Sequence, residues 1–469
     1  MFFTPKTQPN HHWRSIIGKQ HMYHTLDRIT KKILPVWLYQ RLIGDWDKGG
    51  FKKYSSNTSW LFMGKIFSLT VSFFMIAVVA RYLGPENLGK LSYAQSFVAI
   101  FSVFASLGIN QILLRDIVSH PDKETEILGT AFLIKITFGS ITTLVTATIA
   151  FLTSVDATPA FLILILSLSF ILEPFGLTST VFNARVKAKY TVITQIIISV
   201  IIPLIKLIII FFGKGIIFFA LIIVFEILMN AILSLFFYIK IFHHNPVKWK
   251  IDFKYGKKLI NNSLPMLFAG VSGYLFSRID QVMLLHMIGP ISVGLYQGAV
   301  QVTDMLAGFI PGIIIASLVP ALINAKNSNL DSYFNRLKQL IIFIFLLSVT
   351  IISLIVLLAP WIVGILYGND FNDSVSILYI YVWSSLLYMI VVILQQHLIN
   401  ENKTDIFLFL SVSTAFINII LNLLFIPIFG TKGAALTTII SLIAYLILPL
   451  FIQSTRKDYR KLFFGDKTT

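Results

Sequence analysis

Long apolar runs recur along almost the whole chain. Twelve of them reach the roughly 20 residues that a helix needs to cross the hydrocarbon core of a membrane, and turn-forming residues bound several of them. The runs are continuous and lack the alternation of an outer-membrane β-barrel, so the pattern predicts twelve helices. They cover residues 57–80, 90–112, 127–152, 158–182, 192–212, 215–240, 260–286, 292–322, 336–359, 375–398, 405–428 and 433–453.

The composition supports a membrane protein. Hydrophobic residues make up 56% of the 469 positions and charged residues 13%, and the mean hydropathy is +0.81. Soluble proteins carry about 25% charged residues, so the composition excludes a soluble globular, a disordered and a nucleic-acid-binding protein. The chain has no cysteine, which excludes a disulfide, a thiolate metal site and a cysteine nucleophile. We therefore predict an all-α polytopic membrane protein.

The net charge of +17 indicates how the chain is oriented in the membrane. Once the twelve runs are placed, 30 of the 38 Lys and Arg residues fall in the two terminal segments and the loops on the same side, or within the first or last three residues of the adjoining spans. Cytoplasmic loops collect Lys and Arg, so both termini are predicted to be cytoplasmic. The loops on the opposite side are too short for a folded domain, and they carry Arg81, Lys90, Lys214 and Lys432.

The first 56 residues are basic and lack the apolar core of a signal peptide. Apolar and basic positions mix over residues 13–43, which favours either an amphipathic helix on the inner leaflet or a poorly ordered leader. His11, His12, His21 and His24 lie here without an acidic or cysteine partner nearby. No metal site is predicted.

The chain also contains an internal repeat. Gly84–Gly89 has the pattern GPxxxG, and Gly289–Gly294 repeats it 205 residues later. Phe212–Gly215 has a similar counterpart in Phe429–Gly433, and a basic turn at 187–190 has one at 402–404. Each half then holds six predicted spans, and an even number gives both halves the same orientation, as in transporters with parallel repeats.

We therefore expect 12 transmembrane helices as two parallel-repeat six-helix bundles around a central cavity. The predicted parts are a cytoplasmic N-terminal segment (1–56), a first bundle (57–240), a cytoplasmic linker (241–258), a second bundle (259–455) and a cytoplasmic tail (456–469).

Eight ionisable residues lie more than three residues inside the predicted spans, where charges are costly and usually face a cavity or a partner. Lys206 is only about 9 Å from its helix end, so snorkelling accounts for it. Lys65 and Lys135 lie roughly 12 Å from the cytoplasmic ends, where snorkelling is strained. The other five are Arg278, Glu173, Glu226, Asp280 and Asp304.

Glu226 and Asp304 are predicted near mid-membrane, which makes each a candidate for a protonation site or an ion ligand; a mutually paired structural charge is the alternative. Glu173 precedes Pro174, and proline frees a backbone carbonyl in a helix. This pair is a candidate hinge or cation site, with a simple kink as the alternative.

Arg278 and Asp280 are two positions apart, and such positions do not face each other on a helix, so each needs its own partner. Both fit one wide aqueous cavity, in which the planar guanidinium of Arg278 is suited to hold phosphate. An interhelical ion pair is the structural alternative.

Three regions of the chain carry recognisable motifs. The first has Asn57 and Trp60 before Lys65, the RYLGPENLG turn, and LGI followed by Arg115. The second has Asn261 and Pro265 before Ser277–Asp280 and Val293–Tyr296, and the third has Asn418 and Asn422 before Ile426–Ala435. With these motifs, roughly residues 57–455 resemble polysaccharide biosynthesis flippases, the O-antigen and repeat-unit transporters of the multidrug/oligosaccharidyl-lipid/polysaccharide exporter superfamily.

The resemblance implies a V-shaped cavity and translocation of undecaprenyl-diphosphate-linked oligosaccharide across the bacterial cytoplasmic membrane. Its partners are then the lipid-linked oligosaccharide, membrane lipids and polysaccharide assembly proteins. It also implies that Lys65 and Arg278 face the cavity and neutralise diphosphate or acidic sugars. We expect no cofactor, and Asp280, Asp304 and Glu226 motivate coupling to a proton or sodium gradient. The eight charges formally cancel, so a basic cavity requires a protonated acid or acids that face elsewhere.

Three alternatives were weighed. A drug or metabolite antiporter of the same superfamily is the nearest, and the Arg-Ile-Asp segment favours polysaccharide over it. A major-facilitator transporter lacks support, because the loop 113–126 has no Gly-rich basic turn. A membrane enzyme such as a polymerase or ligase needs bulk outside the membrane, which the short loops do not provide, and the chain has no Walker or HExxH motif.

Overall fold

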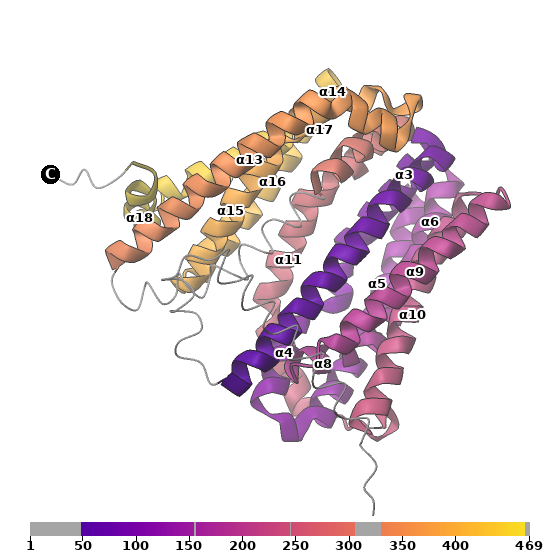
Figure 1. Cartoon of the computed structure of the whole chain (residues 1–469), viewed down its shortest axis with the longest axis vertical. Helices are drawn as coiled ribbons and strands as arrows, with labels where there is room; N and C mark the ends of the chain where they lie inside the picture. Colours follow the sequence, from indigo (N-terminus) through magenta and orange to yellow (C-terminus); the bar gives the residue numbers. More distant parts are fainter. Residues whose placement is uncertain (1–47, 154–155, 244, 305–329, 465–469) are drawn as a thin grey trace, which may run out of the picture. The chain divides into compact units, whose positions relative to one another are not determined.

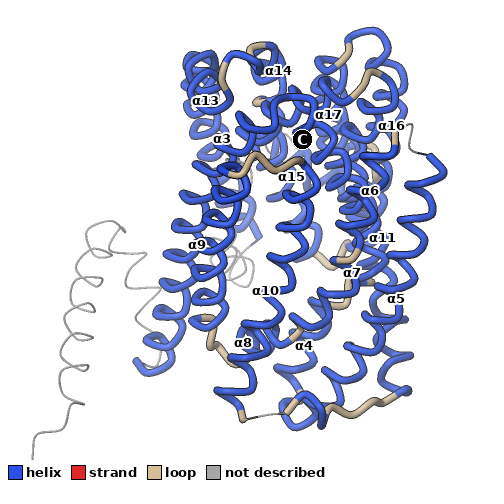
Figure 2. The backbone as a smooth tube through the Cα atoms, turned by 90° about the vertical axis from the view of Figure 1, so that its right-hand side faces the viewer, coloured by secondary structure: helices blue, strands red, loops and turns tan. Residues whose placement is uncertain are grey.

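The computed structural model describes residues 48–153, 156–243, 245–304 and 330–464, and every regular element among them is a helix (Figure 2). The chain divides into a short unit, residues 1–63, and a large unit, residues 64–469. The predicted amphipathic segment 13–43 lies outside the described residues, as does the greater part of the predicted span 292–322. Only residues 290–304 of that helix are described.

The helices follow the predicted runs, with differences at turns (Figure 1). Up to the middle of the chain they are α3 (Lys48–Ser106), α4 (Asn110–Ser119), α5 (Glu124–Thr153), α6 (Ala157–Ser167), α7 (Ser169–Leu172), α8 (Thr178–Ala184), α9 (Lys189–Phe211) and α10 (Ile216–Phe242). Then come α11 (Phe253–Met287), α13 (Leu330–Tyr367), α14 (Asp373–Tyr381), α15 (Trp383–Asn400), α16 (Thr404–Phe429), α17 (Thr431–Ile447) and α18 (Gln453–Phe464).

Two of the differences have clear backbone causes. The predicted spans 57–80 and 90–112 form one element, α3, which is interrupted at Gly84 with φ 67° and ψ 174°. Glycine adopts this left-handed region without the steric cost of a Cβ. The predicted span 158–182 is broken into α6, α7, a 3₁₀ turn at Glu173–Gly176 and α8, because Pro174 cannot donate a helical hydrogen bond.

The outer surfaces of these helices are apolar. Nine helical stretches among the described residues are long and apolar enough to span a membrane. Large hydrophobic side chains such as Phe211, Leu152 and Leu357 are 74–85% exposed, which a water-facing surface does not tolerate over a wide area. The structure is that of an all-α, multi-pass membrane protein.

Helix α11 packs against both halves of the sequence. Near its start, Gly256 lies against Thr130 and Ile134 of α5, and Leu259 belongs to the hydrophobic core of the first half. Farther along, α11 packs on α16. The first bundle predicted at 57–240 and the second at 259–455 therefore share this helix as a contact surface.

The predicted linker 241–258 is docked on α5. The backbone of Lys250 passes so close to Gly129 that a side chain there would overlap it, and the backbone N–H of Asp252 donates to the Thr130 hydroxyl at 2.9 Å. The Asp252 carboxylate then caps α11 by accepting from the N–H groups of Lys254 and Tyr255, as N-cap residues do.

The C-terminal helix α18 is also docked. Tyr459 and Leu462 are buried. Lys403, which precedes α16, donates from Nζ to the Asp458 carboxylate at 2.7 Å and to the Ser454 carbonyl at 2.9 Å. Burial raises the pKa of Asp458, but contacts with His397 and Lys403 outweigh it, so its pKa lies below the ordinary 3.8.

The lowered pKa of Asp458 predicts how the docking of α18 depends on pH. The ionised carboxylate stabilises the docked helix at every pH above 3.8, the ordinary value, and this stabilisation is lost as the pH falls through the lowered value. A spin label at Lys457Cys, in a chain without native cysteine, should stay immobile from pH 7 to 5 and gain mobility below about pH 4.

The matched variant is Lys403→Ala, which removes the cation and should mobilise the label already at pH 7. Lys432→Ala, an exposed lysine elsewhere, serves as the control. A label that stays immobile at pH 7 in the Lys403→Ala variant would contradict this account of α18.

Candidate functional site

The two GPxxxG turns touch each other reciprocally, at the end of the helices that we call the Gly-Pro end. A Cβ at Gly89 would overlap the carbonyl oxygen of Pro290, and a Cβ at Gly294 would overlap that of Pro85. The last glycine of each motif therefore leaves room for the backbone carbonyl of the proline in the other motif. We call these four residues the Gly-Pro contact.

Hydrogen bonds next to the Gly-Pro contact join α3 to the second half. Ser96 of α3 donates to the Gln281 side-chain carbonyl at 2.6 Å, and Gln281 donates onward to Gln297 at 2.6 Å. Tyr93 of α3 and His286 of α11 lie 3.3 Å apart, Oη to Nε2. Ser96 and Gln281 are buried, so separating the halves here would leave polar groups without partners.

Arg81 is the cation that closes the Gly-Pro end. Its guanidinium donates to the carbonyl oxygens of Gly364, Ile365 and Leu366 at 2.6–3.2 Å. These carbonyls belong to the last turn of α13, where the helix dipole favours positive charge. The Gly364 carbonyl also accepts from the Gly368 N–H at 3.1 Å. The sequence pattern placed Arg81 in a short loop and gave it no role.

Asp280 lies in a buried polar network within the second half. The carboxylate is 4% exposed and accepts hydrogen bonds from the Tyr296 hydroxyl at 2.8 Å, the Thr438 hydroxyl at 2.9 Å and the Asn422 amide at 2.6 Å. Asn422 also donates to Asn418 at 3.0 Å. Among the described residues, no Lys, Arg or His forms an ion pair with Asp280.

The sequence predicted separate partners for Arg278 and Asp280, and the partners of Asp280 are the neutral donors of this network. Arg278 is half-buried, and it interacts electrostatically with Asp304, which is exposed near the end of the described helix 290–304. Lys65 is exposed on α3. The structure thus associates Arg278 with Asp304, and both interact electrostatically with Tyr381, as Asp280 also does.

Four more of the ionisable residues within the predicted spans interact two by two. Lys135, interpreted from sequence as a strained snorkelling lysine, is instead buried, and its Nζ lies 2.8 Å from Glu173 Oε1 and 2.9 Å from Asn110 Oδ1. Depth along the helix left snorkelling possible but strained, and the structure supplies a partner instead, because the Pro174 turn brings Glu173 to Lys135. Glu226 is half-buried and interacts electrostatically with Lys206.

Comparison with known proteins adds the family. Residues 55–326 match the family described as polysaccharide biosynthesis protein. The chain belongs to this family. It is similar to the capsular polysaccharide biosynthesis protein CapF of Staphylococcus aureus, with 23% identity over 403 residues that cover 83% of this chain and 97% of CapF. A "Probable low-salt glycan biosynthesis flippase" of Haloferax volcanii is 25% identical over 193 residues, 41% of each chain.

Solved structures show the fold. An inward-facing multidrug resistance MATE family transporter of the MOP superfamily aligns with a TM-score of 0.71 and 14% identity, over 85% of this chain and 96% of its own. The lipid II flippase MurJ aligns with a TM-score of 0.63 and 17% identity, over 86% and 89%. This polysaccharide biosynthesis protein therefore has the fold seen in MOP superfamily transporters.

The Gly-Pro contact predicts a steric effect in this family member. Gly89→Ala should disfavour closure of the Gly-Pro end by about 1–3 kcal/mol, the usual cost of overpacking, because backbone and not a flexible side chain occupies the space. Double electron–electron resonance between labels at Lys214Cys and Asp370Cys should show a longer distance. Gly273→Ala, which meets nothing within 4 Å, should leave the distance unchanged; an unchanged distance in Gly89→Ala as well would refute the steric account.

Proposed function

We propose that this protein flips undecaprenyl-diphosphate-linked oligosaccharide repeat units across the bacterial cytoplasmic membrane for polysaccharide or O-antigen biosynthesis. The family match over residues 55–326 carries the proposal. A capsular polysaccharide protein aligned along nearly its whole length supports the substrate class, and the MurJ-like fold supports lipid flipping. Twelve spans in two parallel bundles, with both termini in the cytoplasm, belong to the same proposal.

The Gly-Pro contact supports alternating access as the mechanism. On the proposed orientation the Gly-Pro end is non-cytoplasmic, and it is held shut by the two motifs, by Arg81 and by the Ser96–Gln281 hydrogen bond. Transport requires these contacts to separate while the opposite end closes. Packed contacts of this kind favour two discrete states over a continuum.

The charge pairs support a basic substrate cavity. Lys135 forms an ion pair with Glu173, and Lys206 interacts electrostatically with Glu226, while Asp280 is buried in its own network. The remaining set is Lys65, Arg278 and Asp304, with a formal charge of +1. In our proposal Arg278 binds the diphosphate through its planar fork and Lys65 adds positive charge, while Asp304 competes for Arg278 and promotes release.

Replacement of Arg278 tests the flippase. Arg278→Ala should reduce translocation of lipid-linked repeat units at least about tenfold, as expected for loss of a charge-assisted bidentate contact. Surface glycan should then fall while lipid-linked repeat units accumulate on the cytoplasmic side, and Arg278→Lys should restore part of the activity. Arg456→Ala, on the exposed face of α18, is the control. Normal surface glycan in Arg278→Ala removes Arg278 from the mechanism, and drug extrusion without glycan flipping would favour the antiporter.

We propose further that Asp280 couples transport to a cation gradient, either protons or sodium. The carboxylate is buried without a basic partner among the described residues, and the Asn422 amide and the Thr438 hydroxyl donate to it. The side-chain oxygen of Asn418 accepts from the same Asn422 amide and adds a third oxygen to the network. Carboxylate, amide and hydroxyl oxygens are ligands that hard cations prefer. Glu226 and Asp304 become weaker candidates, since each interacts with a basic residue.

Asp280→Asn should remove coupling without changing the volume of the site. In reconstituted vesicles, an imposed proton or sodium gradient should accelerate flipping by the unmodified protein and not by the variant. Thermal unfolding of both proteins checks that the variant is folded, and Asp370→Asn, an exposed residue, is the control. Transport that stays unchanged in the unmodified protein after both gradients are collapsed would disprove coupling.

A further inference from the structure

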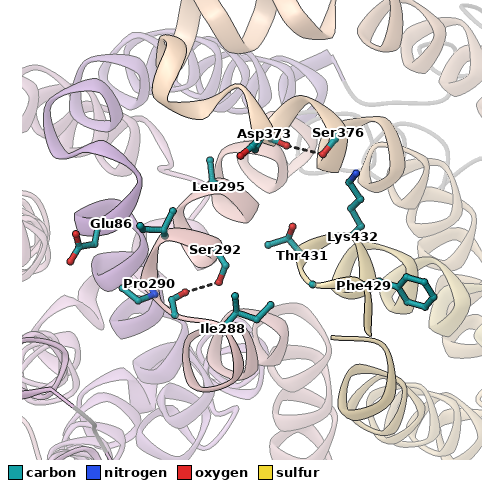
Figure 3. A pocket seen from close by; sticks show the side chains of 13 residues that line it. Glu86, Ile288, Pro290, Ser292, Leu295, Asp373, Ser376, Phe429, Thr431 and Lys432 are labelled. Atoms are coloured by element: carbon teal, nitrogen blue, oxygen red, sulfur yellow. Dashed lines mark hydrogen bonds between the residues drawn. The ribbon is translucent and has the colours of Figure 1, made fainter. Parts of the chain in front are cut away.

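A cavity of about 730 Å³ lies beside the Gly-Pro contact (Figure 3). The turn at residues 288–295, the start of α14 and the turn between α16 and α17 line it, and Glu86 of the first half completes its wall. Its volume falls within the range of small-molecule sites. Lys65, Arg278 and Asp280 do not line it, so it is separate from the substrate and ion sites proposed above.

The lining is rich in hydroxyl groups. Ser292, Ser376 and Thr431 all belong to it. The Ser292 hydroxyl donates its proton to the Gly289 carbonyl at 2.6 Å, and the Ser376 hydroxyl donates to the Asp373 backbone carbonyl at 2.9 Å. Both oxygens therefore keep lone pairs with which to accept a ligand's hydrogen bonds.

One ammonium and one carboxylate are available to a ligand. Within the described part of the chain, the side chains of Lys432 and Asp373 have no hydrogen bond or ion pair, and both are exposed. The third charged residue, Glu86, is held by Lys90 at 2.6 Å, and Figure 3 shows its carboxylate pointing away from Thr431 and Lys432. Asp373 would repel a polyanion and Lys432 would repel a polycation, so the cavity favours an uncharged, hydrogen-bonding ligand.

The other wall is apolar, formed by Ile288, Pro290, Ile291, Leu295 and Phe429. Uncharged sugars combine hydroxyl groups, which both donate and accept, with apolar C–H faces. We propose that this cavity binds an uncharged sugar unit of the exported glycan, a proposal that rests on the proposed function. Asp373 and the serine hydroxyls accept the sugar's hydroxyl protons, Lys432 donates to its oxygens, and Phe429 covers a C–H face.

The bound sugar stabilises the closed Gly-Pro end. Pro290 belongs both to the cavity and to the Gly-Pro contact, and the wall at Glu86 comes from the other half. Separating the halves removes Glu86 from the remaining lining. A ligand that prefers one of two states shifts the population towards it, so glycan already exported slows reopening of the transporter towards that side until it is removed.

Distance measurements test the site directly. The protein in nanodiscs carries labels at Lys214Cys and Asp370Cys, and the probe is the soluble oligosaccharide that mild acid releases from the strain's own lipid-linked repeat unit. The oligosaccharide should increase the population with the short, closed distance. In Asp373→Asn/Lys432→Gln the concentration for half the effect should rise about tenfold, because charge-assisted hydrogen bonds are lost. Asp156→Asn, exposed and outside the cavity, should behave like the unmodified chain.

Two results would overturn the proposal: no population change with the oligosaccharide, or the same change with equal potency in the double variant. Equal potency of inorganic pyrophosphate would overturn the assignment to an uncharged ligand. These outcomes are independent of the proposed function, because the probe is soluble and the readout is a distance. A protein that fails to flip lipid-linked repeat units in the Arg278 experiment would refute the function even where the oligosaccharide closes the Gly-Pro end.

Discussion

The backbone-to-backbone approach of the two GPxxxG turns is the constraint around which this structure is arranged. Gly89 and Gly294 each leave room for the proline of the other motif, so any side chain at either position would hold the turns apart. The contact is self-complementary, as in a twofold interface where one patch meets its own copy. Because the turns meet, Arg81 can reach the end of α13 and Ser96 can reach Gln281.

A second constraint comes from the hydrocarbon surroundings, where an unpaired charge is too costly to persist. Lys135 and Glu173 satisfy each other, Lys206 lies near Glu226, and Asp280 is satisfied by neutral donors. These arrangements use up most of the charges within the spans. Lys65, Arg278 and Asp304 are the charges left for a ligand in our proposal. Their net charge is positive because the other ionisable residues within the spans have partners elsewhere in the protein.

The sequence was sufficient for features that depend on local order along the chain. Apolar run length located the helices, and the repeated GPxxxG motif identified the two turns that meet. The partner of each charged side chain was not predictable from the sequence, because it depends on which helices become neighbours. The depth of Lys135 along its helix suggested strained snorkelling, whereas the Pro174 turn places the Glu173 carboxylate beside it. The role of Arg81 could not be predicted from the sequence, since its guanidinium donates to backbone carbonyls, which every residue provides.

The proposed gate and the proposed ion site lie on the same two helices, at adjacent positions. In α11, Asp280 belongs to the buried network and Gln281 to the hydrogen bonds at the Gly-Pro end. In the helix 290–304, Tyr296 donates to Asp280 while Gln297 accepts from Gln281. A rotation of α11 that releases Ser96 from Gln281 must also move Asp280 relative to Asn422. In our proposal, cation occupancy at Asp280 acts on the gate through α11, and coupling needs no longer path.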